Sequence, residues 1–274
     1  MTLVEMLEIA GGGFVTGILG ALLGIGGGVF LVPFLVLFLH MPIHEAVAIS
    51  LVTIIATSCV TGAAHVKDGT TNLRLAMTLE VASVAGALAG GLLSLRVREH
   101  TLMWMFSGVL LLTAAAMMRK GIGANVDSGF APPNGRLDGA YTDPATGQSI
   151  AYGVRRTPLA LGISGAAGVV SSMLGIGGGV IQVPVLTLCC GVPIRAATAT
   201  SNLIIGVTTG AGAALAYLQG RVDPHVTAPA LFGVLIGSVL GTRAGRRVQS
   251  RAILLLFAGV LAALAVNMVL RAMT

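Results

Sequence analysis

A glycine-rich sequence occurs twice in this chain, and its residues are the ones best suited to bind a ligand through the backbone. This sequence reads LLGIGGGVFLVP at residues 22–33 and MLGIGGGVIQVP at residues 173–184, and both copies lie within long apolar runs. Glycine in a helix interior costs roughly 1 kcal/mol relative to alanine, so each cluster predicts an interruption of a helix. Unpaired amides at the start of the following helix, with the helix dipole behind them, attract anions.

We therefore expect the two clusters to form an anion cradle near the middle of a membrane, without any buried Lys or Arg. Glycine tolerates positive φ and lets a ligand approach the backbone closely. The residues expected to bind are Gly24, Gly26, Gly27 and Gly28 in the first copy and Gly175, Gly177, Gly178 and Gly179 in the second. The alternative is close helix packing, because the first and last glycines of each copy have the spacing of small residues at helix contacts. Two copies, each followed by proline, favour the ligand site.

Polar side chains on the segment after each cluster could complete this site. The candidates are Ser50, Thr53 and Thr57 in the first half of the chain, and Ser201, Asn202, Thr208 and the neighbouring Thr209 in the second half. Those of the first half share one helix face, because their spacings are three and four residues. Hydroxyl groups can bind an oxyanion without a buried charge. Their alternative role is hydrogen bonding between helices, which contributes about 0.6 kcal/mol on average in membranes.

Two titratable residues are candidates for carrying a coupling proton. Glu80 lies several residues inside an expected membrane-spanning helix, and an intramembrane carboxyl group is a functional-site hypothesis by default. His65 is the second candidate. The alternatives are an acid that reaches the membrane interface for Glu80 and a residue at a helix end for His65. We interpret His44 and Glu45 as polar loop residues.

The composition places this chain in a lipid environment. It has 274 residues, of which 55% are hydrophobic and 9% charged, with a mean hydropathy of +0.94. A soluble domain carries about 25% charged residues, so this chain could not cover its surface with polar groups. In lipid every backbone polar group needs an internal partner, which predicts an all-α membrane protein. The partners expected are therefore the lipid bilayer and a small anionic solute.

Several other classes of function are disfavoured by the same residues. We find no Ser-His-Asp, HExxH, CxxC or P-loop arrangement, so we expect neither an enzyme nor a cofactor. The formal charge of +6 is better explained by Lys and Arg in cytoplasmic loops than by nucleic-acid binding. Cys59, Cys189 and Cys190 all lie in apolar segments, which suits neither a disulfide framework nor a metal site. The N-terminus has two acids and no Lys or Arg before its apolar stretch, which argues against a signal peptide.

The chain matches itself when it is shifted by 151 residues. Between residues 11–118 and 162–269 there are 32 identities in 108 positions without a gap. We interpret this as a duplication, the usual architecture of a secondary transporter with its site at the repeat interface. The predicted parts are a membrane repeat at 1–120, a polar linker at 121–157 and a second membrane repeat at 158–274. Turn-rich residues between Leu137–Tyr141 and Ser149–Val154 predict a small β-hairpin in the linker.

Each repeat has about four hydrophobic segments, and the first is too long for one crossing. As a single helix, residues 9–39 would be about 46 Å long, against a hydrocarbon core of about 30 Å. A segment broken at GIGGG that re-enters, as two short helices, gives three crossings per repeat and inverts the second repeat. Of the 16 Lys and Arg, only Arg96, Arg98, Arg221 and Arg271 then lie on one side. The other twelve lie opposite, as the positive-inside rule requires of a cytoplasmic face, and both termini are outside.

The doubled GIGGGV…VP motif, the helices with Ser and Thr, and the short basic loops resemble the TauE/SafE family of sulfite exporters, also called the toluene-sulfonate uptake permeases. The likeness covers both halves, and its signature falls on Gly24–Gly28 and Gly175–Gly179. The resemblance implies a transporter in the bacterial inner membrane for sulfite, sulfoacetate and related sulfonates, with proton coupling. Two alternatives are a channel or metal-cation permease that uses the carbonyls of the broken helices, and an assembly subunit without transport.

Overall fold

The computed structural model describes residues 3–122, 135, 137–142, 149–245 and 251–273. Arg136, Arg246 and Arg247, which enter the charge count above, lie outside the described residues, as do residues 143–148 of the expected hairpin. In the first half the helices are α1 (Leu3–Leu23), α2 (Gly28–Leu37), α3 (Ile43–Lys67), α4 (Leu73–Leu93) and α5 (Glu99–Ile122). In the second half they are α6 (Thr157–Leu174), α7 (Gly179–Pro184), α8 (Ile194–Leu218), α9 (Pro224–Gly245) and α10 (Arg251–Met273).

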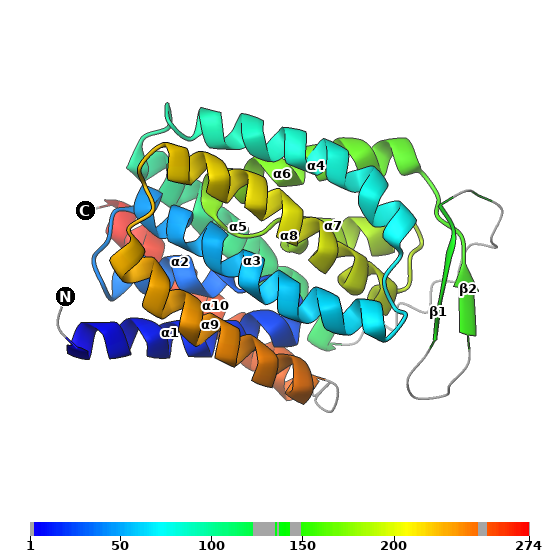
Figure 1. Cartoon of the computed structure of the whole chain (residues 1–274), viewed down its shortest axis with the longest axis horizontal. Helices are drawn as coiled ribbons and strands as arrows, with labels where there is room; N and C mark the ends of the chain where they lie inside the picture. Colours follow the sequence, from blue (N-terminus) through cyan, green and yellow to red (C-terminus); the bar gives the residue numbers. More distant parts are fainter. Residues whose placement is uncertain (1–2, 123–134, 136, 143–148, 246–250, 274) are drawn as a thin grey trace.

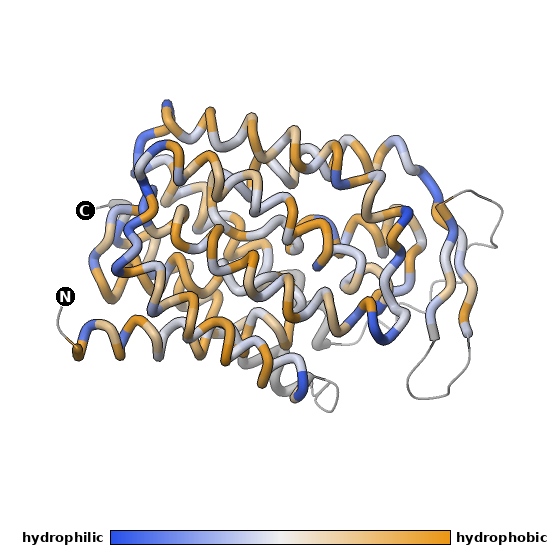
Figure 2. Tube along the Cα trace, in the orientation of Figure 1, coloured by the Kyte–Doolittle hydropathy of each residue, from blue (hydrophilic) through white to orange (hydrophobic). Residues whose placement is uncertain are grey.

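The expected class of an all-helical membrane protein is confirmed. By length and composition, six helices of the described chain could cross a membrane: α1, α3, α4, α6, α8 and α9 as far as Ala244. Three shorter apolar helices accompany them, at Gly28–Leu37, Gly179–Cys189 and Ala258–Arg271. Apolar residues follow the helices along their length, whereas hydrophilic residues gather at the helix ends (Figure 2). This distribution suits a bundle with its sides in lipid and its ends in water.

The helices of the two halves interlock (Figure 1). α3 and α8 pack against each other, α1 packs along α9, α4 along α6, and α5 along α10. Helices α1 and α6 begin at opposite ends of the bundle, and the two ends of the chain lie together at one end. The order of elements is the same in both halves, with a broken segment followed by three long helices. That this order reflects a duplication is our interpretation of the sequence.

Small residues allow the two pairs that contain α1 and α6 to pack closely. A Cβ atom on Gly13 or Gly17 of α1 would lie only 2.5 Å from the carbonyl oxygen of Ala230 or Val234 in α9. In α4, a Cβ on Gly86 would collide with the backbone of α6. Contacts of this kind are the usual means of helix association in lipid, where hydrophobic burial between helices contributes little. They hold the second half of α1 against α9 and the middle of α6 against α4.

The broken segments differ from the expected pair of short helices. α1 has 21 residues, which is about 31 Å at 1.5 Å per residue, whereas α2 has only 10. The part of α1 from Ala10 onward packs on α9, whereas residues 3–8 are exposed. The second segment is less regular, because α7 ends at Pro184 and residues Val185–Cys189 continue as a π-helical turn. Proline removes a helical hydrogen bond and favours such an irregularity.

The described part of the linker contains two short strands, β1 (Gly139–Thr142) and β2 (Ser149–Tyr152), which pair antiparallel. The side chains of Tyr141 and Tyr152 are buried in an apolar cluster with Leu75 and Leu79 of α4. The pair of strands therefore packs on the helical bundle. It lies at the end opposite to the two chain ends (Figure 1).

Candidate functional site

Both glycine clusters interrupt their helices, as the sequence predicts. The chain leaves α1 at Leu23 and re-enters a helix at Gly28, and it leaves α6 at Leu174 and re-enters at Gly179. Within each turn three glycines adopt positive φ: Gly24 (68°), Gly26 (87°) and Gly27 (82°), and Gly175 (66°), Gly177 (84°) and Gly178 (70°). A residue with a Cβ atom is strained in this conformation, which explains why glycine occupies these positions.

The two turns contact each other in the middle of the bundle. A Cβ atom on Gly28 would collide with the carbonyl oxygen of Gly175, and one on Gly179 would lie 3.5 Å from the carbonyl oxygen of Gly24. Ile54, near the middle of α3, flanks both turns. The structure therefore brings the eight candidate glycines together, although they come from segments about 150 residues apart in the chain. The turns are unwound and are also closely packed against each other.

Each helix that leaves a turn starts with unpaired amides. In α2 the amides of Phe30 and Leu31 donate to the carbonyl of Gly27, at 3.0 and 3.2 Å. Within the described chain the amides of Gly28 and Val29 have no hydrogen-bond partner. The same holds at the start of α7, where the amides of residues 181 and 182 bond to Gly178 and those of residues 179 and 180 do not. Such amides bind anions at other helix N-termini.

A narrow cleft lies against the first turn. Its lining consists of Thr16, Gly26, Gly27, Leu31, Thr53, Thr57 and Val234. Its empty space is about 140 Å³ including the open mouth, but no part of it is wide enough for a water molecule, so the cleft is closed in this conformation. The hydroxyls of Thr53 and Thr57 donate to carbonyls of their own helix, at 2.9 and 3.4 Å. They would have to rotate to donate to a ligand. Thr16, which donates to Gly13 at 3.0 Å, was not predicted from the sequence.

Ser50, a predicted site residue on α3, contacts the second glycine turn. Its hydroxyl is fully buried and donates to the carbonyl of Gly175 over 2.8 Å. It therefore ties α3 to the second turn and joins the two halves of the chain.

A buried network of polar side chains connects α7 to α8 and α4. Gln182 accepts a hydrogen bond from the hydroxyl of Ser201 and donates one to Ser83, both over 3.2 Å. Thr208 also donates to Ser83, over 2.8 Å. Ser201 and Thr208 were predicted, whereas Gln182 and Ser83 were missed. The sequence did mark both residues as unusual. The shift by 151 residues pairs polar Gln182 with apolar Leu31 and polar Ser83 with apolar Val234.

Several buried polar side-chain atoms have no partner in the described structure, and two of them lie beside the turns. They include the amide nitrogen of Asn202 and the hydroxyls of Ser58, Ser171 and Ser172. A Cβ on Gly24 would lie 3.6 Å from the Asn202 nitrogen, and one on Gly178 would lie 3.7 Å from the Ser171 hydroxyl. Leaving such a group unpaired costs about 1–3 kcal/mol. A polar ligand beside the turns would relieve this cost.

The two proton-coupling candidates lie away from the turns. Glu80 is half-buried on α4, three residues before Ser83, and lines neither of the two clefts described for this chain. His65 lies near the end of α3, eleven residues beyond Ile54, which is about 16 Å along a helix. Its backbone carbonyl accepts a hydrogen bond from Thr70. Our interpretation of His44 and Glu45 as loop residues is wrong, since both lie in the first turn of α3.

Metal ligands are not gathered in the described part of the chain. It contains no group of three or more His, Cys, Asp or Glu side chains that could hold a metal ion. Cys59, Cys189 and Cys190 are free cysteines.

Helices broken at the centre of a membrane bundle are typical of transporters, in which the unwound backbone lines the solute site. The chain belongs to the Sulfite exporter TauE/SafE family, whose sequence pattern matches residues 9–268. It is therefore a multi-pass membrane protein of a transporter family and not an enzyme.

Three similar proteins carry the description of a probable membrane transporter. YunE of Bacillus subtilis is 24% identical over 251 residues, covering 89% of this chain and 90% of its own. YdhB of the same organism is 26% identical over 231 residues, with 84% and 86% coverage. MJ0441 of Methanocaldococcus jannaschii is 26% identical over 231 residues, with 82% and 76% coverage. No solved structure matches the chain.

Proposed function

We propose that this protein is a secondary-active transporter of small sulfur-containing anions, such as sulfite or a sulfonate like sulfoacetate. One observation carries the proposal: two glycine turns touch at the centre of the bundle and present unpaired amides, with no Lys or Arg among the residues that line them. Membership of a family described as sulfite exporters supports this class of solute.

In the proposed mechanism, the amides of residues 28–29 and 179–180 hold the anionic head between the turns. The hydroxyls of Thr53 and Thr57 rotate toward the solute, and Asn202 donates its unpaired amide group. Because the cleft beside Gly27 is closed, the helices around it must separate to admit a solute. A rocking motion of one group of helices against the other, which opens each end in turn, would supply this access.

The proposed orientation follows from the positions of the basic residues. Arg96, Arg98 and Arg221 follow α4 and α8, at the end that also holds the two chain ends. Most of the remaining Lys and Arg, including Lys67 and Arg156, belong to segments at the opposite end. By the positive-inside rule the second end would be cytoplasmic, with the termini outside. A bacterial inner membrane is the location that this arrangement suits.

The test is solute flux in proteoliposomes with leucine at the turns. Gly27 and Gly178 both have positive φ, and a Cβ on Gly27 would lie 3.0 Å from the carbonyl oxygen of Thr16. We expect Gly27→Leu and Gly178→Leu to insert into the membrane but to lose sulfite flux. Gly108→Leu is the matched control, because Gly108 is exposed on α5 with no atom near its Cβ position. Wild-type flux in both turn variants would refute the cradle.

A channel or metal-cation permease is the second candidate. α1 and α6 also end at these turns, so carbonyl oxygens lie there as well as amides. The carbonyl of Gly175, however, already accepts the hydroxyl of Ser50. Flux that follows the cation when the anion is replaced would favour this candidate over the anion transporter.

A further inference from the structure

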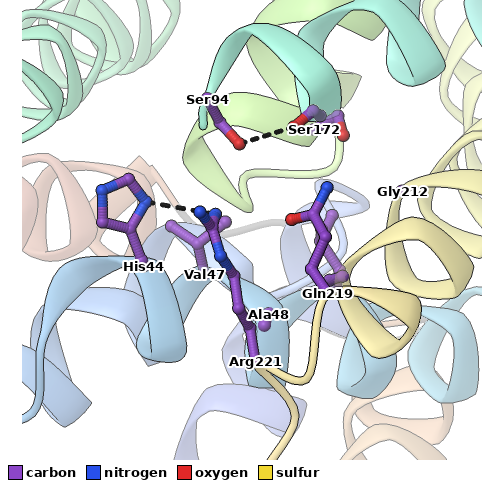
Figure 3. Close-up of a pocket in the computed structure, with 11 residues that line it drawn as sticks. His44, Val47, Ala48, Ser94, Ser172, Gly212, Gln219 and Arg221 are labelled. Atoms are coloured by element: carbon purple, nitrogen blue, oxygen red, sulfur yellow. Dashed lines mark hydrogen bonds between the residues drawn. The ribbon is translucent and has the colours of Figure 1, made fainter. Parts of the chain in front are cut away.

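A second cleft opens at the end of the bundle that holds the two chain ends. It lies between the first turn of α3 and the C-terminal ends of α4, α6 and α8 (Figure 3). The polar side chains that line it are His44, Ser94, Ser172, Gln219 and Arg221. Its empty space is about 240 Å³ including the open mouth, but the enclosed part has room for only about one water molecule, so the cleft must widen to admit a solute.

Hydrogen-bond donors dominate this cleft. The guanidinium of Arg221 lies 3.4 Å from Nδ1 of His44, which must accept because a guanidinium can only donate. Within the described residues this is the one hydrogen bond that the Arg221 side chain makes, and Arg221 lines the cleft. The amide nitrogen of Gln219 is buried and has no partner. The hydroxyl of Ser172 is also unpaired, and this residue is only 4% exposed.

Two glycines leave room around the unpaired hydroxyl. A Cβ on Gly212 would lie 2.9 Å from the oxygen of Ser172, and one on Gly91 would lie 3.0 Å from it. Any larger residue at either position would fill the space beside Ser172. The space beside Ser172 therefore depends on the absence of side chains at Gly91 and Gly212.

The lining contains one permanent positive charge and no carboxylate. Glu99 is close enough to interact electrostatically with His44, but it does not line the cleft. A fixed guanidinium with neutral donors around it favours a small anion over a cation.

The inner wall of the cleft packs against the second glycine turn. Val47 lines the cleft, and a Cβ on Gly175 would lie 3.0 Å from the carbonyl oxygen of Val47. Ser172 lies three residues before Gly175 in the same segment. Within this lining, Ser172 is thus about one helical turn from the second glycine turn. Arg221 and its partner His44 lie farther out, since His44 is ten residues before Ile54 along α3.

We propose that this cleft is an anion-binding vestibule through which the solute reaches the second glycine turn, an inference that rests on the proposed function only in that the solute is an anion. The shift by 151 residues pairs Arg221 with Thr70 and Gln219 with Asp68. The first half of the chain therefore has neither the guanidinium nor the side-chain amide at the matching positions, which lie at the opposite end of the bundle. The vestibule belongs to one face of the protein.

The test measures charge selectivity at a thiol placed in the cleft. Gln219→Cys is introduced into the full chain with Cys59, Cys189 and Cys190 changed to alanine. Its reaction rate is measured with an anionic ethylsulfonate methanethiosulfonate and with a cationic trimethylammonium analogue. We expect the anionic reagent to react about tenfold faster, because focused positive potential raises the local concentration of anions. Adding Arg221→Gln should remove most of this preference.

Arg96→Gln is the matched control, because Arg96 is an exposed arginine at the same end and does not line the cleft. It should leave the preference unchanged. Sulfate or sulfoacetate should slow the reaction, whereas sodium chloride at equal ionic strength should not. Sulfite is avoided because it consumes the reagent. Equal rates for the two reagents, no reaction with either, or equal effects of Arg221→Gln and Arg96→Gln would overturn the proposal. This labelling does not depend on transport, so its result stands apart from the flux of the Gly27→Leu variant.

Discussion

The hydroxyl of Ser50 donates a hydrogen bond of 2.8 Å to the carbonyl oxygen of Gly175, a residue 125 positions away. Ser50 is fully buried in the first half of the chain, and Gly175 opens the glycine turn of the second half. The bond therefore fixes the contact between the halves at the point where a solute is proposed to bind. It also satisfies a carbonyl that has no helical partner, because α6 ends at Leu174.

Removal of this bond should weaken the fold and transport together. In Ser50→Ala the buried carbonyl of Gly175 loses its donor, which costs about 1 kcal/mol or more. We expect a lower unfolding temperature of the purified protein and reduced sulfite flux in proteoliposomes. Ser107→Ala is the control, because Ser107 is equally buried but donates to Met103 of its own helix. If the two variants unfold at the same temperature, the bond across the halves contributes nothing of its own.

The network around Gln182 should matter for transport more than for folding. Leucine occupies the matching position of the first half, so Gln182→Leu keeps the side-chain volume while Ser201 and Ser83 lose a partner. We expect the half-saturation concentration for the anion to rise several-fold, measured as initial flux against solute concentration. Thr187→Val is the control, since Thr187 donates only to Val183 in the same segment. An unchanged half-saturation concentration would show that the network has a structural role alone.

The sequence predicts where the two helices are interrupted, but not which residues pack around the interruptions. The glycine clusters predict the broken helices because conformational cost is a local property, and the composition predicts the membrane class. The partner of Ser50 could not be predicted, because helical spacing gives the face of a residue but not which helix or turn packs against it. The unequal lengths of α1 and α2, 21 and 10 residues, were likewise not predicted. Gln182 and Ser83 meet only through tertiary contact, which local spacing does not predict. The repeat did single them out, because each is polar where the matching residue of the other half is apolar.

Glu80 is the residue that we expect to carry a coupling proton. It is half-buried in α4, one helical turn from Ser83 and so near the Gln182 network. In Glu80→Gln an imposed proton gradient should no longer accelerate anion uptake, while exchange of anion for anion continues. The measurement is flux with and without the gradient, together with a pH-sensitive dye inside the liposomes. His65→Gln is the comparison variant. Loss of coupling in that variant alone would transfer the role to His65, and intact coupling in both would exclude the two residues.

The proposed topology can be tested by labelling introduced cysteines in intact cells. Arg98 follows α4 at the end that holds the chain ends, and Ala244 lies at the far end of α9. In a background without native cysteines, a membrane-impermeant maleimide should label Arg98→Cys and should label Ala244→Cys only after the cells are opened. Labelling of both residues from the same side would contradict the inverted arrangement, because the positive-inside rule assigns these ends to opposite faces.

The linker strands should depend on Asn72 for their attachment to the bundle. The side chain of Asn72 caps α4 by accepting from the amide of Leu75 at 3.1 Å, and it donates to the carbonyl of Leu137 at 2.9 Å. Asn72→Ala removes both bonds, and loss of the cap alone costs about 1 kcal/mol. We expect a lower unfolding temperature and faster cleavage of the linker by protease. Thr71→Ala is a close control, because the buried hydroxyl of Thr71 has no hydrogen-bond partner in the described structure. Equal protease sensitivity in the two variants would mean that the strands are held by the apolar contacts of their tyrosines instead.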